Sequence, residues 1–577
     1  MQKLLIYMKP YIGMSLCAVA LLFVQAICDL ALPDYMSDIV NTGVMGNNTE
    51  YILKIGGKML LVALFGAIAS VIVGYFAAMI AASVSRDLRL DVFKKVQAFS
   101  NAEYDTFSTA SLITRTTNDI TQIQTLLVML IRLLFYAPIL GIGGVIKAIS
   151  KSGSMTWIIA AAVTCLIGLI IFLFLVAIPK FKIIQNLIDK LNLVTRENLD
   201  GMLVIRAFNS QKFENARFDK ANIELTDVTL FVNNSMALMM PAMMLIMNLT
   251  SVLIVWIGSK QVSSFDMDIG TMMGFMQYAM QIIMAFLMLA VMFILIPRAA
   301  VSANRISDVL STPERILDPK KPLAYDKNFI PTIEFRNVNF HYPGSEGNIL
   351  ANISFTAKSG KTTAIIGSTG SGKSTLVNLI MRFYDITGGE ILVAGKDIRS
   401  VRKKDLRSKI GYVPQKSILF SGTIKSNLFY ADKNTIMKNI EKAAFIAQAT
   451  EFINSKEGGY DAAIAQGGTN VSGGQKQRLS IARALVKNAP IYIFDDSFSA
   501  LDLKTDRKLR ENLKKETGNS TILMVTQRVS TIMDADQIIV LDNGCIVGIG
   551  THKELLKTCD VYLQIATSQL SEEELSK

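Results

Sequence analysis

The sequence predicts a two-part protein, with an all-α polytopic domain of six membrane-spanning helices followed by a soluble α/β domain. Its 577 residues exceed what one ordinary domain holds. Long uncharged apolar runs fill the first 300 residues, and the sequence after about residue 330 has the mixed composition of a soluble protein. A strand, a glycine-rich loop and a helix follow one another near residue 370. We therefore expect a membrane domain at 1–300, a linker at 301–330 and an α/β domain at 331–577.

Composition excludes some classes of protein. Hydrophobic residues make up 51% of the chain, charged residues only 18%, and the formal net charge is +12. A basic chain can bind nucleic acid, but many of these basic residues lie in connections between apolar runs, where membrane topology accounts for them. We expect no nucleic-acid partner. The five cysteines form no C-x-x-C pair, which argues against a disulfide framework or a metal site.

Six apolar runs have the length of a membrane crossing, roughly 20 residues. They cover residues 11–32, 59–82, 126–146, 157–178, 236–257 and 272–296. Four runs carry no charge, whereas the first contains Asp29 and the third contains Arg132. Because ionisable side chains are costly in lipid, both should face the bundle interior or an aqueous cavity. For Asp29, near a membrane end, simple solvation is an equal alternative.

The connections between the runs predict the orientation of the chain. Those after the second and fourth runs are long and rich in Lys and Arg, whereas the other three are short. Basic connections remain on the cytoplasmic side. We therefore expect a multi-pass protein of the cell membrane, with both termini, the α/β domain and the two long connections in the cytoplasm. The helical pattern of these connections predicts that the spans continue as helices beyond the bilayer.

Methionine recurs every three or four residues in the last two runs, which places each set on one helical face. The sets are Met236, Met240, Met243, Met244 and Met247, and Met276, Met280, Met284, Met288 and Met292. Two interpretations remain open: helix packing or lipid contact, and an adaptable lining for varied apolar cargo. Gln277 and Gln281 lie beside the second set and could face a cavity.

A complete phosphate-binding loop follows a predicted strand at 362–366 and opens a helix. Its glycines let backbone N–H groups surround phosphates. Lys373 should reach the β- and γ-phosphates, and the Ser374 hydroxyl should ligate Mg²⁺. The loop residues are Gly367, Ser368, Thr369, Gly370, Ser371, Gly372, Lys373, Ser374 and Thr375. By itself this loop predicts only that the chain binds a nucleoside triphosphate.

Two further motifs complete the α/β domain. A second apolar strand, 491–494, ends in Asp495 and Asp496, and Asp495 is placed as the second Mg²⁺ anchor. Between the loop and this strand, a helix running to about residue 487 opens with Ser472, Gly473, Gly474 and Gln475. Ser472 can cap this helix, and the glycine amides form a second anion site. Since the chain already has one phosphate site, the second predicts a nucleotide held by another subunit.

With these motifs, the chain resembles a half of an ATP-binding cassette (ABC) transporter of the exporter type (type I exporter, type IV fold) over essentially its whole length. The SGGQ signature between the two phosphate-site motifs is the most specific feature. The resemblance implies that ATP and Mg²⁺ are the cofactors. It implies that Tyr342 stacks on adenine, with a surface aromatic near a turn as the alternative, and that Gln415 senses Mg²⁺. It also implies a dimer-crossing loop at 499–502, and two arms near 104–119 and 197–213 that dock on nucleotide domains.

Two positions depart from the family pattern at the catalytic centre. The family usually has a glutamate directly after the Walker B aspartate, which is Asp495 here. This chain has Asp496 at that position, with a side chain one methylene shorter. Where the family usually has a histidine, this chain has Gln527. A less usual Gln466 also stands where the family commonly has glutamate. A site that lacks a well-placed base should bind ATP firmly and hydrolyse it slowly. The alternative is that Asp496 serves adequately as the base.

The resemblance and its departures together imply a heterodimer. A second, related half-transporter would carry the glutamate and histidine, and this chain would lend Ser472–Gln475 to that competent site. The implied function is ATP-driven export of amphipathic or hydrophobic small molecules across a lipid bilayer. Import of metal chelates by the same architecture and export of lipid or peptide remain alternatives. The membrane spans argue against a non-transporting ATPase.

Overall fold

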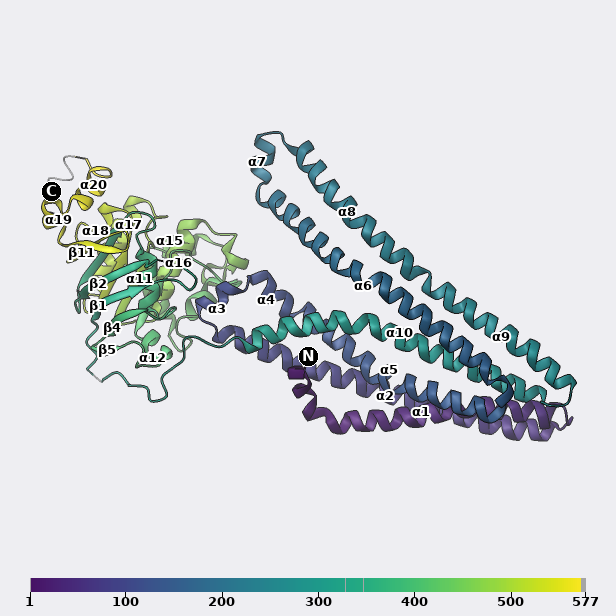
Figure 1. Ribbon diagram of the computed structural model, residues 1–577. Coiled ribbons are helices and arrows are strands. Elements are labelled where there is room, and N and C mark those ends of the chain that lie inside the picture. The colour runs from purple at the N-terminus through teal and green to yellow at the C-terminus, as the bar shows by residue number, and fades with distance from the viewer. Residues whose placement is uncertain (1, 327, 346, 572–577) are drawn as a thin grey trace. The chain divides into compact units, whose positions relative to one another are not determined.

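The computed structural model of the chain describes residues 2–326, 328–345 and 347–571. The chain divides into two compact units. One comprises Met1–Gln97 and Thr109–Thr312, and the other comprises Ala98–Ser108 and Pro313–Lys577. The described residues of the first unit form helices and turns but no strand, whereas the second contains three sheets (Figure 1).

The first unit is built from long helices. In chain order they are η1 (Gln2–Tyr11), α1 (Ile12–Asp38), η2 (Ile39–Val44), α2 (Thr49–Ala98), α4 (Thr109–Thr116), α5 (Asn118–Lys151), η3 (Gly153–Met155), α6 (Thr156–Asp200), α7 (Met202–Ala207), α8 (Gln211–Ala237), α9 (Met239–Ser263) and α10 (Ile269–Ser311). Within the described residues, six helical segments are long and apolar enough to cross a membrane, which confirms the predicted polytopic fold. The helices also continue well past the apolar runs, as the sequence predicts: α2 ends at Ala98 and α6 at Asp200.

The predicted fifth run, 236–257, lies almost entirely in α9. The single residue Leu238 separates α8 from α9. Pro241 lies in the first turn of α9, where a missing N–H breaks no helical hydrogen bond. The proline therefore fits the start of a new helix better than the interior of a continuous one.

The core of this unit forms where α1, α5 and α10 meet. Tyr278 of α10 is fully buried there and donates a hydrogen bond to the carbonyl of Leu30, 2.9 Å away. Small residues let these helices approach closely: a Cβ on Gly144 would lie 2.9 Å from Cγ1 of Ile282. Elsewhere in the unit, α6 and α8 pack as a hairpin joined by the short α7 (Figure 1).

The methionines of the last span do not share one environment. Met280 and Met284 are 37% and 44% exposed, whereas Met292 is buried and Met276 packs against the core. Each step of four residues rotates a side chain by about 40° around an α-helix, so the five side chains span an arc of about 160°. Their exposure differs along this arc, and both interpretations of the set stay predictions.

The second unit contains twelve strands within its described residues. They are β1 (Ile333–Phe340), β2 (Leu350–Ala357), β3 (Thr362–Gly367), β4 (Gly388–Val393), β5 (Lys396–Asp397), β6 (Ile410–Val413), β7 (Gly422–Thr423), β8 (Ala463–Ile464), β9 (Ile491–Asp495), β10 (Thr521–Val525), β11 (Gln537–Asp542) and β12 (Cys545–Gly550). The main sheet has the order β12-β11-β3-β10-β9-β6 and is parallel except for β12. A four-stranded antiparallel sheet has the order β2-β1-β4-β5.

Helices cover both faces of the main sheet. They are α11 (Lys373–Ile380), α12 (Lys403–Ser408), α13 (Ile424–Phe429), α14 (Met437–Ile446), α15 (Thr450–Ser455), α16 (Gly473–Val486), α17 (Leu503–Glu516), α18 (Val529–Ile532), α19 (His552–Thr558) and α20 (Asp560–Thr567), and α3 (Asn101–Thr106) also belongs to this unit. Successive residues of β3 enter opposite cores: Ala364 and Ile366 lie in one, Ile365 in the other. A strand covered on both faces is uniformly apolar, which matches the predicted α/β fold.

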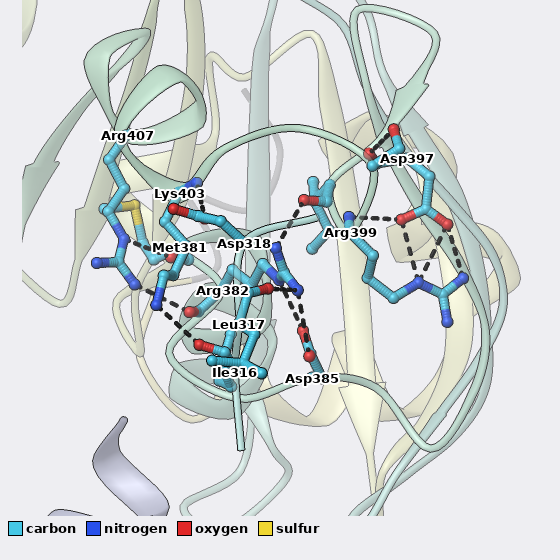
Figure 2. Close-up of polar contacts among 12 residues, drawn as sticks. Ile316, Leu317, Asp318, Met381, Arg382, Asp385, Asp397, Arg399, Lys403 and Arg407 are labelled. Carbon is cyan, nitrogen blue, oxygen red and sulfur yellow. Dashed lines mark hydrogen bonds and ion pairs between the residues drawn. The ribbon is translucent and has the colours of Figure 1, made fainter. Parts of the chain in front are cut away.

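The segment that follows α10 is held to the end of α11 (Figure 2). Arg382 is buried, and its backbone is left-handed with a φ of 50°. Its guanidinium donates to the Leu317 carbonyl at 3.2 Å and pairs with the Asp385 carboxylate at 2.8 Å. Lys403 donates to the Ile316 carbonyl at 2.8 Å. Charged donors thus fix this stretch of backbone beside the helix that begins at the phosphate-binding loop.

Candidate functional site

The main sheet gathers the predicted site residues on one edge. In a parallel sheet, the carboxyl ends of neighbouring strands lie together. Here β3, β10, β9 and β6 are neighbours in that order. The phosphate-binding loop follows β3, Gln527 follows β10, Asp495 and Asp496 end β9, and Gln415 follows β6. Residues separated by more than 150 positions in the sequence therefore meet at this edge.

The loop after β3 adopts a conformation that requires glycine at two positions. Gly370 and Gly372 have φ angles of 86° and 98°, and a Cβ on Gly372 would lie 2.7 Å from Cδ2 of Leu350. Ser368 and Thr369 are exposed at the rim of the loop, and α11 begins directly at Lys373. A left-handed loop leading into a helix N-terminus presents several N–H groups to one point and suits an anion.

Lys373 lies within the loop rather than in solvent. Its ammonium donates to the carbonyls of Gly367 and Ser368 at 2.8 and 2.6 Å. Burial lowers the pKa of Lys373, and the carboxylates of Asp496 and Asp495 oppose this change. The positive charge is thus held between the loop and the two aspartates, where a bound phosphate would meet it.

Ser374 and Asp495 form the oxygen pair that a Mg²⁺ ion requires. The Ser374 hydroxyl donates to Oδ1 of Asp495 at 3.1 Å. Asp495 is only 3% exposed, and this burial raises its pKa to about 6. The described residues contain no group of three or more His, Cys, Asp or Glu side chains that could hold a metal ion. A cation here would therefore need oxygens from phosphate and water beside this pair, which is how Mg²⁺ is usually bound.

Asp496 is fixed in an uncommon backbone conformation. Its φ is 45°, in the left-handed region that aspartate tolerates better than most residues. Its N–H donates to the Val525 carbonyl at 2.9 Å. The pKa of its half-buried carboxyl is raised by burial, and a hydrogen bond from Gln415 acts against this rise. The predicted residue Gln415 thus lies near enough to influence the titration of Asp496.

Gln527 is exposed at the end of β10, and its carbonyl accepts from Nε2 of Gln569 at 2.8 Å. The next residue, Arg528, was missed by the sequence reasoning. Its guanidinium donates to the carbonyls of Ser499 and Leu501 at 2.7 and 3.4 Å, and so fixes the predicted dimer-crossing loop at 499–502. A basic residue three positions after a strand at the site edge was the signal available in the sequence.

The glycine-rich start of α16 has the predicted cap. The Ser472 hydroxyl accepts from the Gln475 N–H at 3.3 Å, and the Gln475 side chain accepts from the Ser472 N–H at 3.1 Å. Ser472 and Gly473 are exposed, and a Cβ on Gly473 would meet nothing within 4 Å. The N–H groups at this helix end therefore open onto the surface.

Gln477, one helical turn further, links this helix to the catalytic edge. It is 4% exposed, its amide donates to the Asp496 carbonyl at 3.3 Å, and its oxygen accepts from the Ala500 N–H at 3.3 Å. Nothing in the sequence pattern distinguished this glutamine, because its two partners lie at least 19 residues away.

An aromatic contact connects the predicted adenine site with α3. The Tyr342 hydroxyl hydrogen-bonds Oγ1 of Thr375 at 2.9 Å, which places its ring beside the phosphate-binding loop. Tyr342 packs edge to face against Tyr384, with ring centroids 5.1 Å apart. The Tyr384 hydroxyl then donates to Oδ2 of Asp105 in α3 at 2.8 Å. Three side chains thus join the loop to the first predicted arm.

The tips of the two predicted arms differ in their surroundings. In α3, Glu103 is 3% exposed and accepts from the backbone N–H groups of Ser100 and Arg315 at 2.7 and 3.2 Å. At the tip formed by α7, Leu203 is 81% and Phe208 is 77% exposed. The first tip is embedded in its own unit, and the second presents apolar side chains.

Comparisons with known proteins agree with this architecture. The chain matches a model for the ABC transporter transmembrane region at residues 15–307 and one for the ABC transporter at 350–499. An uncharacterized ABC transporter ATP-binding protein of Mycobacterium tuberculosis is 40% identical over 98% of this chain and 97% of the relative. A fatty acid ABC transporter ATP-binding/permease protein of the same species is 33% identical over 83% of this chain and 75% of the relative. The structure of a bacterial Atm1-family ABC exporter with ATP bound matches with a TM-score of 0.79 and 26% identity, over 97% of this chain and 98% of that one.

Proposed function

Because this chain belongs to the ABC transporter family, we propose that it forms one half of a heterodimeric exporter of amphipathic small molecules. Exporter-type transport driven by ATP hydrolysis follows from the family and from the match to an exporter structure. The proposal adds the partner, the unequal division of hydrolysis between two ATP sites, and the class of cargo.

The pair Asp496 and Gln527 carries the proposal. In this family each ATP lies between the phosphate-binding loop of one domain and the signature of the other. The carboxylate of Asp496 is one methylene short, and Gln527 brings no positive charge to the γ-phosphate. A well-placed base contributes about 10²–10⁴-fold to hydrolysis. This chain's own loop therefore binds ATP and turns it over slowly, while most hydrolysis takes place at the site to which Ser472–Gln475 contribute.

The remaining residues have the roles that their positions support. Residues 367–375 and Tyr342 hold ATP, and Ser374 and Asp495 hold Mg²⁺ with Gln415 beside them. Bound Mg²⁺ would neutralise phosphate charge, while Lys373 orients the phosphates. The exposed apolar tip at α7 docks on the partner's nucleotide domain, since its side chains have no cover in the described residues of their own unit. The spans lie in a bacterial cell membrane with both termini in the cytoplasm.

A gain of ATPase activity tests the proposal that the two ATP sites hydrolyse ATP unequally. In the chain purified alone, Asp496→Glu combined with Gln527→His should raise ATPase activity at least about tenfold, because a base of ordinary length and a positive charge return to the site. The matched control is Asp461→Glu, an exposed aspartate outside the site. Vigorous ATP turnover by the unmodified chain alone, at the rate of the assembled transporter, would contradict the proposal.

Lipid transport is the second candidate, favoured by the fatty acid transporter that is 33% identical to this chain. Inside-out membrane vesicles distinguish the candidates and the direction together. ATP-dependent accumulation of an amphipathic dye supports small-molecule export, and accumulation of a labelled fatty acid instead supports lipid export. ATP-dependent loss of either compound from loaded vesicles would indicate import.

A further inference from the structure

Two aspartates of α1 lie little more than one turn apart, and their surroundings differ. Asp34 is neutralised by two lysines of α5, with Lys147 at 2.8 Å and Lys151 at 3.1 Å. Asp29 receives a hydrogen bond from the Tyr136 hydroxyl at 2.6 Å. Among the described residues it forms no ion pair. The carboxylate nearer the middle of the membrane is thus the one that lacks a counter-charge.

A carboxylate in a membrane-spanning helix is expensive unless it is paired or has a function. A basic candidate on α5 is Arg132, four residues before Tyr136. Its side chain is exposed, and within the described part of the chain no ion pair or hydrogen bond joins it to Asp29. Tyr136 supplies one neutral hydrogen bond, which does not cancel a full negative charge. The position of Asp29 therefore favours a cation that the chain itself does not supply.

Other groups around Asp29 suit a positively charged ligand. The Gln281 amide donates to the Asp29 backbone carbonyl at 2.9 Å, which holds α10 against α1. The Gln281 side-chain oxygen is buried and has no hydrogen-bond partner among the residues that the structure describes. On α2, Gly66 has no side chain, and a Cβ there would lie 3.7 Å from Oδ1 of Asp29. The Asp29 carboxylate and the unpartnered Gln281 oxygen thus belong to a polar group beside Gly66, where α2 has no side chain.

An apolar surface borders this polar group. Gln281 is flanked on α10 by Met280 and Met284, which are 37% and 44% exposed. Methionine side chains are flexible and polarizable, and adapt to apolar groups of varied shape. A ligand with one positive group and an apolar body would match both surfaces.

We propose that Asp29, Tyr136 and Gln281 form a binding site for the positively charged group of an amphipathic cargo, whose apolar body lies along Met280 and Met284. The inference rests on the proposed export of small molecules and specifies their charge. The Asp29 carboxylate attracts the cation, Tyr136 fixes the carboxylate, and the Gln281 oxygen accepts from an ammonium N–H or faces its charge. A fatty acid would meet repulsion from Asp29, which separates this cargo from that of the 33% identical relative.

The test compares three probes with the same apolar body: the trimethylammonium, uncharged and propionate forms of diphenylhexatriene. ATP-dependent transport of each is measured with the transporter assembled with its partner in inside-out vesicles. The readout is the ratio of cationic to uncharged probe, so the level of assembled protein cancels. Asp29→Asn should lower this ratio about tenfold, the loss expected when one charge interaction is removed from a partly desolvated site. Asp29→Glu, which keeps the charge, should restore most of it.

Asp34→Asn is the matched control, because it removes a carboxylate from the same helix that is already paired with two lysines. It should leave the ratio at the wild-type value. Gln281→Glu provides a gain that misfolding cannot mimic, since a second carboxylate beside Asp29 should raise the ratio several-fold.

An unchanged ratio in Asp29→Asn overturns the site, and so does a wild-type preference for the propionate probe, which would point to Arg132 instead. If the wild-type transporter moves none of the three probes, the proposed export of small molecules fails first. Transport of all three regardless of charge refutes only the Asp29 site.

Discussion

Two helices of the nucleotide-binding unit begin with glycine-rich anion sites, but only one has charged groups gathered behind it. The start of α11 lies against Lys373, Asp495 and Asp496 at the edge of the main sheet. The start of α16 is capped by Ser472 and opens onto the surface. Both starts present helix N–H groups that suit phosphate, and in the proposed dimer each would complete a site of the partner.

The two helix starts differ in what they contribute to ATP binding and to ATP hydrolysis. Affinity for phosphate requires N–H groups and a cation, which the α11 site has. Hydrolysis also requires a placed base and a stabilised γ-phosphate, where Asp496 and Gln527 depart from the family pattern. The α16 site has kept its usual residues, so it should matter more to turnover although it contains no charged catalytic group.

Gly473→Asp should cause the largest loss and gives the strongest test of this difference. The new side chain has room, since a Cβ at Gly473 meets nothing within 4 Å, and aspartate is favourable in the first turn of a helix. The fold should survive, but the carboxylate repels phosphate. ATP turnover by the assembled transporter should fall at least about 10²-fold. Gly473→Ala, which adds no charge, is the control and should retain most activity. A mild effect of Gly473→Asp would mean that the α16 site does not serve the main hydrolytic centre.

Lys373→Met should produce an intermediate effect, confined to nucleotide binding by this chain. The lysine supplies the cation of the α11 site, and losing a charged hydrogen bond lowers affinity by about 10- to 100-fold. Labelling of this chain by a photoreactive ATP analogue should fall accordingly, while turnover of the assembled transporter falls less than tenfold. Lys361→Met, which removes an exposed lysine paired with Asp536 at 2.9 Å, is the control. Equal losses of labelling and turnover would show that both ATP sites hydrolyse.

Acidification should weaken Mg²⁺-dependent ATP binding at the α11 site. Burial raises the pKa of Asp495 to about 6, and Mg²⁺ requires the ionised form. Between pH 7 and pH 5 the ionised fraction falls about tenfold, so Mg²⁺-dependent affinity should fall to a similar extent. Titrations of the isolated chain with labelled ATP at fixed free Mg²⁺ measure this, and Asp495→Asn should remove the pH dependence. A flat profile in the wild type would show that Asp495 is already ionised at pH 5.

The same aspartate should affect stability with a definite sign. Its pKa is higher in the folded chain than the ordinary 3.8, so the folded state binds the proton more tightly. Stability therefore decreases as the pH rises from about 4 to about 6, and Asp495→Asn should stabilise the domain at pH 7 by up to roughly 3 kcal/mol. Thermal unfolding of both forms at pH 4 and pH 7 would show a difference only at the higher pH.

Asp496→Ala should have the smallest effect. Since the partner's site carries most hydrolysis in the proposed heterodimer, the assembled transporter should lose about half of its ATPase activity or less. Replacing the partner's glutamate should abolish it. If Asp496→Ala alone stops the transporter, Asp496 is an effective base, and the contrast between the two anion sites disappears.

The fold class and the grouping of the ATP-site residues were predictable because they depend on local patterns. A long apolar run specifies a spanning helix whatever lies elsewhere, and the strand before Gly367 and the helix after Lys373 define the loop between them. The parallel arrangement of β3, β10 and β9 agrees with their buried, uniformly apolar sequences.

Long-range side-chain partners were not predictable in the same way. Tyr136 lies 107 residues from Asp29, and neither residue type signals the other. The left-handed backbone of Arg382 has no signature in the sequence, since arginine rarely adopts it, and neither have its contacts with Leu317 and Asp385. The exposure of each methionine in the last span was not predictable for a different reason: a spacing of four residues turns the side chains progressively around the helix.

If Tyr342 stacks on adenine, as the family resemblance implies, the contact from Tyr342 through Tyr384 to Asp105 would link recognition of the nucleotide base to the position of α3. Linkage is reciprocal, so an event that displaces α3 would then change the affinity for ATP by the same factor by which ATP changes that event. A triphosphate without a base could fill the loop but would leave Tyr342 untouched. The chain would then distinguish ATP from a triphosphate without a base, because only ATP would change the position of α3.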